Sequence, residues 1–375
     1  MLVLACLTLA PAGASASSGH CLPGQSLRAC ASGLVTRALG GDQCQSSTPA
    51  PAAQPQPNTS ADRLASLIQD VPCPATGRVS YNTSDNLGDS MAVLDTVPDP
   101  AGGYLGVYHT AYRTQPGAGS TWAFRASLAH SDDLLHWTRI EVLDPVGASM
   151  PTLRPIPGAP GYLLAYEKTL SPHGSNFVRL RYYRTLGGLL AGRVASQRDL
   201  PRSFSPYNNG TPTILSIRWH GRIDRSAIDV GFHYQTVSRG RPGPDREATG
   251  TLSGFARWSP RTDASTDAAL DHVGLSGSHG DWRDFSFEGS SWRVYEAQTS
   301  YNDFGTWRVL LDSSGQMQPL TLSTTAGSVS SSIGNPVAQE EPAPGGHGRV
   351  LMITMFLFGP YATGEGGELV YYQPI

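Results

Sequence analysis

The segment Leu105-Gly-Val-Tyr-His-Thr110 decides the fold, because its pattern of an apolar strand ending in an aromatic and polar cluster recurs along the chain. The other copies are Leu163-Leu-Ala-Tyr-Glu-Lys-Thr169, Val230-Gly-Phe-His-Tyr-Gln-Thr236, Trp292-Arg-Val-Tyr-Glu-Ala-Gln-Thr299 and the degenerate Leu351-Met-Ile-Thr-Met-Phe-Leu-Phe358. Their aromatic residues align as Tyr108, Tyr166, Tyr234, Tyr295 and Phe356, at nearly even intervals. A period of this length, with several short strands in each unit, is typical of the blades of a propeller.

A second element precedes each copy and strengthens this interpretation. It reads Asp89-Ser-Met-Ala, Ser149-Met-Pro-Thr, Gly210-Thr-Pro-Thr, Asp284-Phe-Ser-Phe and Gly334-Asn-Pro-Val. Blades stack radially because none can bury both faces of its sheet alone. We therefore predict an all-β fold, a five-bladed β-propeller over residues 78–375, in which the strand at 368–372 closes the ring against the first blade. A β-sandwich with coincidental repetition is the alternative, and two elements recurring in the same order disfavour it.

Composition agrees with a strand-rich globular chain and excludes some partners. Of 375 residues, 39% are hydrophobic and 15% are charged, and the chain contains 42 glycines and 29 prolines, which suit many short strands joined by turns. The formal net charge of -3 gives no electrostatic reason to expect nucleic acid as a partner. We expect a monomer.

The chain up to Gly77 differs from the repeats in composition and sequence pattern. Residues 1–16 combine an apolar run with the small residues Ala14-Ser-Ala16, which predicts a signal peptide and a secreted, extracellular protein. The run is too short to span a membrane, and no membrane association is expected. A small Cys-containing segment at 17–46, a Pro/Ala-rich linker at 47–60, and a short helix with a tether at 61–77 follow.

Four cysteines remain after the predicted cleavage, and all precede the repeats: Cys21, Cys30, Cys44 and Cys73. An even number of cysteines in a secreted chain predicts two disulfide bonds. Three pairings are open, and the sequence does not choose among them. A zinc site is the alternative, but the spacings contain no C-x-x-C pair.

The stretch Ala129-His-Ser-Asp-Asp-Leu-Leu-His-Trp137 resembles an S-x-D-L-x-x-W element of five-bladed glycoside hydrolases of family 43 and its relatives. The resemblance implies three axial carboxylates, one from each of the first three blades, and places the general base at Asp89. The second-blade position, Gly147-Ala-Ser-Met-Pro151, offers no acid. The third, Asn208-Asn-Gly-Thr-Pro212, has no glutamate where the family has its general acid. Only one of the three catalytic groups therefore carries over.

The repeats supply further carboxyl groups. Glu167 and Glu296 directly follow the aligned tyrosines of blades two and four, and either could be the acid that assists the leaving oxygen. Lys168 could hold the neighbouring Glu167 ionised, since an opposite charge favours the charged form. The alternative is that each glutamate bonds a neighbouring strand's backbone and that Lys168 is a surface residue.

Candidate substrate-binding residues gather in two places. Ser278-His-Gly-Asp-Trp-Arg-Asp284 brings together His279, Trp282, Arg283 and Asp284. Trp282 could stack on a sugar ring while Arg283 and Asp284 bind hydroxyls, and a tight turn is the structural alternative. In blade three, His233 and Tyr234 are further candidates, although a histidine among apolar neighbours is commonly part of the core.

The sequence contains no G-x-S-x-G, H-E-x-x-H, P-loop or Rossmann fingerprint, so no cofactor and no catalytic metal are expected; a structural cation in the axial channel is left open. The leading hypothesis is a secreted glycoside hydrolase that binds carbohydrate in an axial pocket. A lectin is the rival, but lectins usually keep one site in most blades, whereas these blades diverge. A polysaccharide lyase, with His233 or Tyr234 as base and an arginine neutralising a uronate, is the third interpretation.

Overall fold

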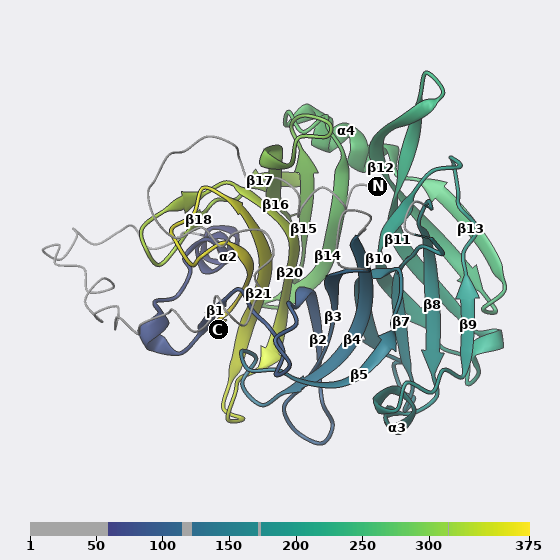
Figure 1. The fold of residues 1–375 in the computed structure, drawn as a ribbon, viewed down its shortest axis with the longest axis horizontal. Helices are drawn as coiled ribbons and strands as arrows, with labels where there is room; N and C mark the ends of the chain where they lie inside the picture. The colour runs from purple at the N-terminus through teal and green to yellow at the C-terminus, as the bar shows by residue number, and fades with distance from the viewer. Residues whose placement is uncertain (1–58, 115–121, 172–173, 314) are drawn as a thin grey trace, which may run out of the picture.

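The computed structural model describes residues 59–114, 122–171, 174–313 and 315–375. Five antiparallel four-stranded sheets follow one another around a common centre (Figure 1). The predicted all-β, five-bladed propeller is confirmed. The predicted signal peptide, the segment at 17–46, nearly all of the linker and three of the four cysteines lie outside the described residues, so the expectations for them stay predictions.

Blades 1 to 4 each consist of four consecutive strands. Blade 1 contains β2 (Ala92–Pro98), β3 (Tyr104–Arg113), β4 (Trp122–Ser131) and β5 (Thr138–Asp144). Blade 2 contains β6 (Ala148–Pro155), β7 (Tyr162–Lys168), β8 (Phe177–Tyr183) and β9 (Ser196–Asp199). Blade 3 contains β10 (Asn209–Arg218), β11 (Ala227–Ser238), β12 (Arg241–Ser253) and β13 (Arg257–Thr262). Blade 4 contains β14 (His279–Phe287), β15 (Ser290–Gln298), β16 (Trp307–Ser313) and β17 (Gln316–Pro319). The first strand of each blade contacts that of its neighbours and is therefore the innermost.

Blade 5 combines the two ends of the described chain. Its strands are β20 (Ser332–Pro342), β21 (Arg349–Gly359), β22 (Gly367–Pro374) and β1 (Val79–Tyr81). Antiparallel pairing places Ser80 of β1 opposite Val370 of β22. The strand at 368–372 thus closes the ring by pairing with the segment that precedes blade 1, and a carboxyl oxygen of Glu368 also accepts the Val93 N–H of blade 1.

Short helices and one small sheet complete the described structure. They are α2 (Ser60–Gln69), α3 (Leu186–Leu190), α4 (Ala264–His272), η2 (Pro74–Thr76), η3 (Ile223–Arg225), η4 (Phe304–Thr306) and the pair β18 (Leu322–Ser323) and β19 (Val329–Ser330). The Thr59 side chain caps α2 by accepting the Asp62 N–H. On α2, Leu64 and Ile68 are fully buried among apolar residues of blades 4 and 5. Burying each such side chain stabilises the fold by about 1.5–3 kcal/mol, so α2 is part of the propeller core.

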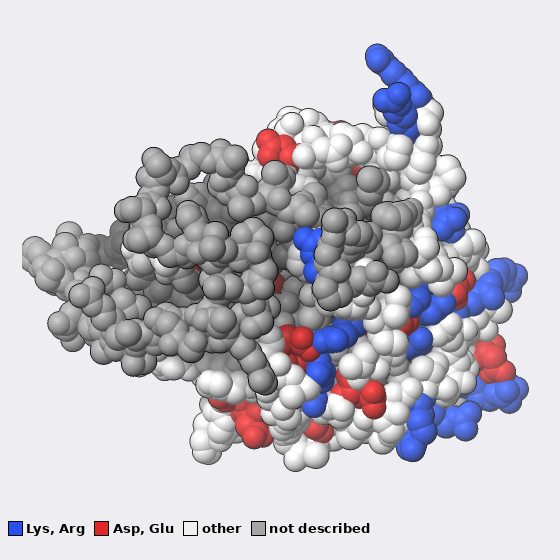
Figure 2. Space-filling view, viewed as in Figure 1, with Lys and Arg blue, Asp and Glu red and all other residues white. Residues whose placement is uncertain are grey.

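Apolar clusters fill the spaces between neighbouring blades. Between blades 1 and 2, for example, Val107 and Leu128 pack with Leu153 and Leu164, all with no exposed surface. The described part of the face seen in Figure 2 carries both acidic and basic side chains. Among the described helices, none has the length and apolar character needed to cross a membrane.

Each innermost strand is interrupted by a bulge near its beginning, and these bulges shape the centre of the ring. The register with the second strand shifts after Ala92, Ser149, Gly210, His279 and Gly334. In four bulges one residue has a positive φ of 41–54°: Val93, Met150, Thr211 and Asn335. This backbone conformation is costly for residues other than glycine, and it is typically kept where the surroundings or function demand it.

Candidate functional site

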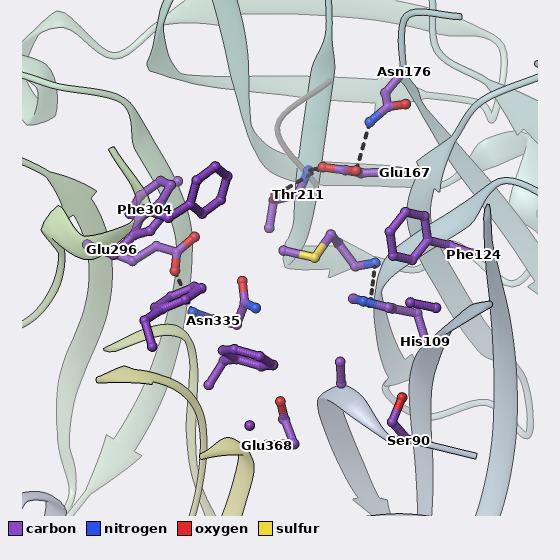
Figure 3. A pocket seen from close by; sticks show the side chains of 18 of the residues that line it. Ser90, His109, Phe124, Glu167, Asn176, Thr211, Glu296, Phe304, Asn335 and Glu368 are labelled. Carbon is purple, nitrogen blue, oxygen red and sulfur yellow. Dashed lines mark hydrogen bonds between the residues drawn. The ribbon is translucent and has the colours of Figure 1, made fainter. Parts of the chain in front are cut away.

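A cavity of about 290 Å³ lies at the centre of the ring and is lined by residues from all five blades (Figure 3). The second strand of each blade contributes at least one residue to it, and these include His109, Glu167, His233, Glu296 and Phe356. Polar groups from separate blades therefore meet at one place. We call this space the axial cavity.

The lining residue of blade 3 corrects the alignment made from the sequence. That alignment placed Tyr234 and Gln235 at the equivalent positions of blade 3, but His233 is the residue that lines the cavity. Successive strand residues point to opposite faces, so a shift of one position changes which side chain reaches the centre.

Glu167 is a buried carboxylate held by four donors. Its Oε1 accepts the Thr211 N–H at 2.7 Å and the Thr211 hydroxyl at 3.1 Å. Its Oε2 accepts the Ser149 hydroxyl at 3.0 Å and the Asn176 side-chain amide at 2.9 Å. Burial alone would raise the pKa of this carboxyl. The charged His233 and the donors outweigh burial, however, and hold the pKa below its ordinary value.

His233 connects Glu167 to a second carboxylate, Asp245 of β12. Its Nε2 lies 2.9 Å from the Thr211 hydroxyl oxygen and 3.8 Å from Glu167 Oε1. Its Nδ1 lies 3.4 Å from Asp245 Oδ1. Burial opposes the charged imidazolium, but the two carboxylates raise the pKa of His233 well above its ordinary value. Asp245, His233, Thr211 and Glu167 thus form a continuous line of charged and hydrogen-bonded groups.

Glu296 and Glu368 are in the opposite electrostatic situation. Glu296 accepts the Asp281 N–H at 3.0 Å and the Asn335 N–H, yet burial raises its pKa. Glu368 accepts the Val93 N–H at 3.2 Å, and burial raises its pKa to about 8. The axial cavity therefore holds one carboxyl driven toward the ionised form and two driven toward the protonated form.

His109 is neutral and has a defined tautomer. Its Nδ1 accepts the Met150 N–H at 3.2 Å, which leaves the proton on Nε2. Burial lowers the pKa of His109 to about 4. The ring packs edge-on against Phe124, with centroids 5.2 Å apart. A neutral N–H donor is thereby fixed in the wall of the axial cavity.

Aromatic side chains of blades 4 and 5 line the side of the cavity next to Glu296. The ring of Phe358 lies 4.9 Å from that of Phe356 and 6.2 Å from that of Phe304, and Trp307 adds an indole. Figure 3 shows Phe304 beside Glu296. Flat apolar rings next to hydrogen-bonding groups suit a ligand with both C–H faces and hydroxyls, as sugars have.

Asp89, the base implied by the family resemblance, lies outside the axial cavity. Its carboxylate binds the guanidinium groups of Arg125 and Arg139, which come from β4 and β5. Arg139 also lies 3.4 Å from Asp85. Asp89 therefore connects the start of blade 1 to its outer strands, and the structure does not support the role of general base for it.

Lys168 does not hold Glu167 ionised. The two residues are neighbours on a strand and point to opposite faces, so the Lys168 ammonium binds Asp144 Oδ1 at 2.9 Å and the Val146 carbonyl. Lys168 is also buried, which corrects its interpretation as a surface residue. The cation near Glu167 is His233.

His279 and Arg283 are buried structural residues away from the axial cavity. His279 lies with Nδ1 2.7 Å from Asp267 Oδ1 and Nε2 3.0 Å from the Leu275 carbonyl oxygen. Arg283 donates to Asp281 Oδ1 at 2.8 Å and is fully enclosed. Neither is placed to bind a sugar hydroxyl.

The remaining candidates also serve the scaffold. The Arg293 guanidinium stacks on the buried Trp282 ring at 3.8 Å and pairs with Asp284, whose side chain points to the outside. Tyr234 packs against Phe204, with ring centroids 5.0 Å apart. Of the candidate site residues, the structure places Glu167, Glu296 and His233 in the axial cavity.

Sequence reasoning missed several groups of the site. Asp245 and Glu368 come from third strands, which the repeated motif does not cover. Thr211 and Asn335 lie within the second recurring element, whose repetition at the start of each inner strand was the available signal. His109 follows the aligned Tyr108 in blade 1, the position that pointed to Glu167 and Glu296, and this repetition could have identified it.

Comparison with protein-family models and with curated proteins gives no match to the sequence. Among solved structures, the protein is similar to a thermostable family-43 glycoside hydrolase (10% identity, 79% of this chain and 92% of that chain, TM-score 0.45). It is also similar to an endo-arabinase from Bacteroides thetaiotaomicron (10%, 79% and 97%, 0.45) and to the GH93 α-L-arabinofuranosidase of Fusarium graminearum (11%, 79% and 97%, 0.44). At identities of 10–11% and TM-scores below 0.5, these likenesses say nothing about the activity of this chain.

Proposed function

We propose that the protein is a secreted glycoside hydrolase that cleaves a polysaccharide or oligosaccharide in the axial cavity. One observation carries the proposal: two buried carboxyl groups, Glu167 and Glu296, line one cavity and have pKa values driven in opposite directions. Glycoside hydrolysis needs this division, with one carboxyl protonated and one ionised.

In the proposed reaction, Glu296 donates its proton to the glycosidic oxygen as the bond to the leaving group breaks. The ionised Glu167 activates a water molecule or attacks the sugar carbon. His233, backed by Asp245, keeps Glu167 ionised across the Thr211 hydroxyl. The N–H at Nε2 of His109 is a donor for a sugar hydroxyl.

The lining of the axial cavity argues against a lyase that acts on uronates. Among the described residues, no lysine or arginine lines it, whereas Glu167, Asp245, Glu296 and Glu368 do. The one cation among these described lining residues, His233, already lies between Glu167 and Asp245, so a uronate carboxylate would find no further cation to neutralise it. A lectin is the second candidate, because Glu167 and Glu296 each accept a backbone N–H from the following blade, a structural role that needs no catalysis.

The test begins with product release from arabinans, xylans, fructans, galactans and uronate polymers, followed by kinetics on aryl glycosides of the responsive sugar. Glu296→Gln should lose activity on substrates with a poor leaving group but retain most of it on 2,4-dinitrophenyl glycosides, which need no proton donor. Glu167→Ala should be inactive on both and regain turnover when azide replaces the lost carboxylate. Asp132→Asn, at a carboxyl whose side chain is 93% exposed, is the matched control.

Each result decides between the candidates, provided that circular dichroism shows folded variants. Equal losses for Glu296→Gln on good and poor leaving groups would remove it as proton donor. Retention on a polymer without release of any product would favour the lectin. An unsaturated, ultraviolet-absorbing product would establish a lyase and overturn the proposal.

A further inference from the structure

A second cavity of about 280 Å³ adjoins the axial cavity over blades 1 to 3. The two share Phe124, Asn176 and Asn208 in their linings, so they are neighbours at this border. Trp122 and Tyr207 contribute aromatic surface to the second cavity. Neither Glu167 nor Glu296, the two groups proposed to break the glycosidic bond, lines the second cavity.

Its chemistry is that of a binding site for neutral, hydroxyl-rich groups. Among the described residues, no aspartate, glutamate, lysine, arginine or histidine lines it, and its polar groups are amides and hydroxyls such as Gln235 and Ser149. The charged side chains that line either cavity in the described part of the chain belong to the axial cavity. Among these described lining residues an anionic or cationic ligand would find no counter-charge, whereas a neutral sugar would find amides, hydroxyls and aromatic rings.

The binding groups at the border are already held in place. The Asn176 side chain donates to Glu167 Oε2 at 2.9 Å, and its backbone N–H donates to Asn208 Oδ1 at 2.9 Å. The Asn208 amide in turn donates to Gln235 Oε1 at 3.3 Å. Asn176 thus joins the ionised carboxylate of the axial cavity to the amides of the second cavity.

The aromatic wall is also fixed. The Arg113 guanidinium lies over the Trp122 ring, 4.2 Å from its centroid, and this stacking holds the indole in one orientation. A rigid ring binds a sugar face at a smaller entropic cost than a mobile ring.

The position of the second cavity indicates which part of the substrate it holds. It begins beside Glu167 and Asn176, whereas Glu296 lies on the opposite side of the axial cavity (Figure 3). The leaving group must lie next to its proton donor, so the rest of the substrate extends away from Glu296. On the premise of the proposed function, we propose that the second cavity binds the neutral sugar unit that precedes the sugar at the cleaved bond. The enzyme would then release a disaccharide or a longer product.

The test compares 4-nitrophenyl monoglycosides with the 4-nitrophenyl disaccharide glycosides of the same sugar, for arabinose, xylose, galactose, glucose and mannose. Both probes have the same leaving group and the same scissile bond, so their kcat/KM ratio isolates the extra sugar. We expect the wild type to prefer the disaccharide probe by about tenfold or more, the scale on which one additional well-packed contact discriminates substrates. Trp122→Ala and Tyr207→Ala should remove this preference and leave the monoglycoside rate unchanged.

Trp219→Ala is the matched control, because Trp219 is a half-buried tryptophan that packs on Tyr182, in another part of the molecule. It should keep the preference. Equal rates on both probes in the wild type, or a preference that Trp122→Ala leaves intact, would overturn the inference while the hydrolase stands. If nothing is hydrolysed, calorimetry with the free disaccharides decides: binding that Trp122→Ala abolishes supports the sugar site and refutes the hydrolase. Absence of any binding overturns both.

Discussion

Replacing Glu368 by glutamine tests the effect of burial on the carboxyl groups at the centre of the ring. Glu368 lines the axial cavity, is almost fully buried, and accepts the Val93 N–H through Oε1. Burial raises its pKa to about 8 from an ordinary value of 4.5. Glutamine has nearly the same shape and keeps an oxygen for Val93, but it cannot ionise.

The size of the effect follows from proton linkage. Because the pKa of Glu368 is higher in the folded than in the unfolded protein, its contribution to stability is fully present below pH 4.5 and is lost as the pH rises through 8. The difference between the two pKa values corresponds to a loss of about 5 kcal/mol above pH 8, and of about 3 kcal/mol at pH 7. Glu368→Gln does not undergo this loss. Between pH 4.5 and 8, its free energy of unfolding should therefore rise relative to that of the wild type by up to about 1.4 kcal/mol per pH unit.

Urea unfolding followed by tryptophan fluorescence, at pH values from 5 to 9, measures this difference directly. The curves of unfolding free energy against pH should converge at low pH and separate as the pH rises, with the glutamine variant the more stable. Asp132→Asn, at a carboxyl whose side chain is 93% exposed, is the control for the removal of one negative charge. Parallel curves for Glu368→Gln would refute the reasoning, because they would mean that Glu368 titrates alike in the folded and unfolded protein.

Three further predictions concern the site and the core. The pH profile of kcat/KM should be bell-shaped, rising as Glu167 ionises below pH 4.5 and falling as Glu296 ionises above pH 4.5. Glu296→Gln should lose the falling limb when it is assayed on dinitrophenyl glycosides. Thr211→Val removes the hydroxyl between His233 and Glu167 but keeps the backbone donor. It should raise the pKa of the rising limb and lower the free energy of unfolding, measured in urea, by about 1–2 kcal/mol. An unchanged rising limb would contradict the role of the Thr211 hydroxyl in keeping Glu167 ionised. Leu64→Ala, in the helix packed on blades 4 and 5, should destabilise the propeller by about 2–5 kcal/mol in the same assay; a loss below about 1 kcal/mol would show that α2 is peripheral.

The propeller could be predicted from the sequence because two apolar patterns recur together at nearly even intervals, and each requires neighbours on both faces. The way the ring closes could not. Blade 5 takes its outer strand from Val79–Tyr81, a short segment near the start of the described chain that carries no pattern of its own. Only the pairing with β22 gives this segment a place, and such a long-range contact leaves no local signal.

The site was predictable where the polar residue sits on a repeated strand, as for Glu167 and Glu296. Where one residue of register decides which side chain reaches the centre, as between His233 and Gln235 in blade 3, the repeated pattern did not settle the choice, although His233 was among the candidates. The placement of Asp89 failed for a related reason. A residue just before the inner strand can turn toward the axis or toward the outer strands, and two arginines of the outer strands bind its carboxylate.

The groups proposed for catalysis also stabilise the junctions between the blades. At four of the five junctions, a buried side chain accepts the backbone N–H of a positive-φ bulge residue in the following blade: His109 from Met150, Glu167 from Thr211, Glu296 from Asn335, and Glu368 from Val93. Burying these polar groups is costly unless they are hydrogen-bonded, and the bulges supply donors that a regular strand would direct into its own sheet.

The junction between blades 3 and 4 departs from this arrangement, because the Asp281 N–H turns back to Glu296. His233 then holds no bulge of the following blade, and its imidazole lies instead between Asp245 and the Thr211 hydroxyl next to Glu167. The break in the structural pattern is therefore where the cation that ionises Glu167 is placed.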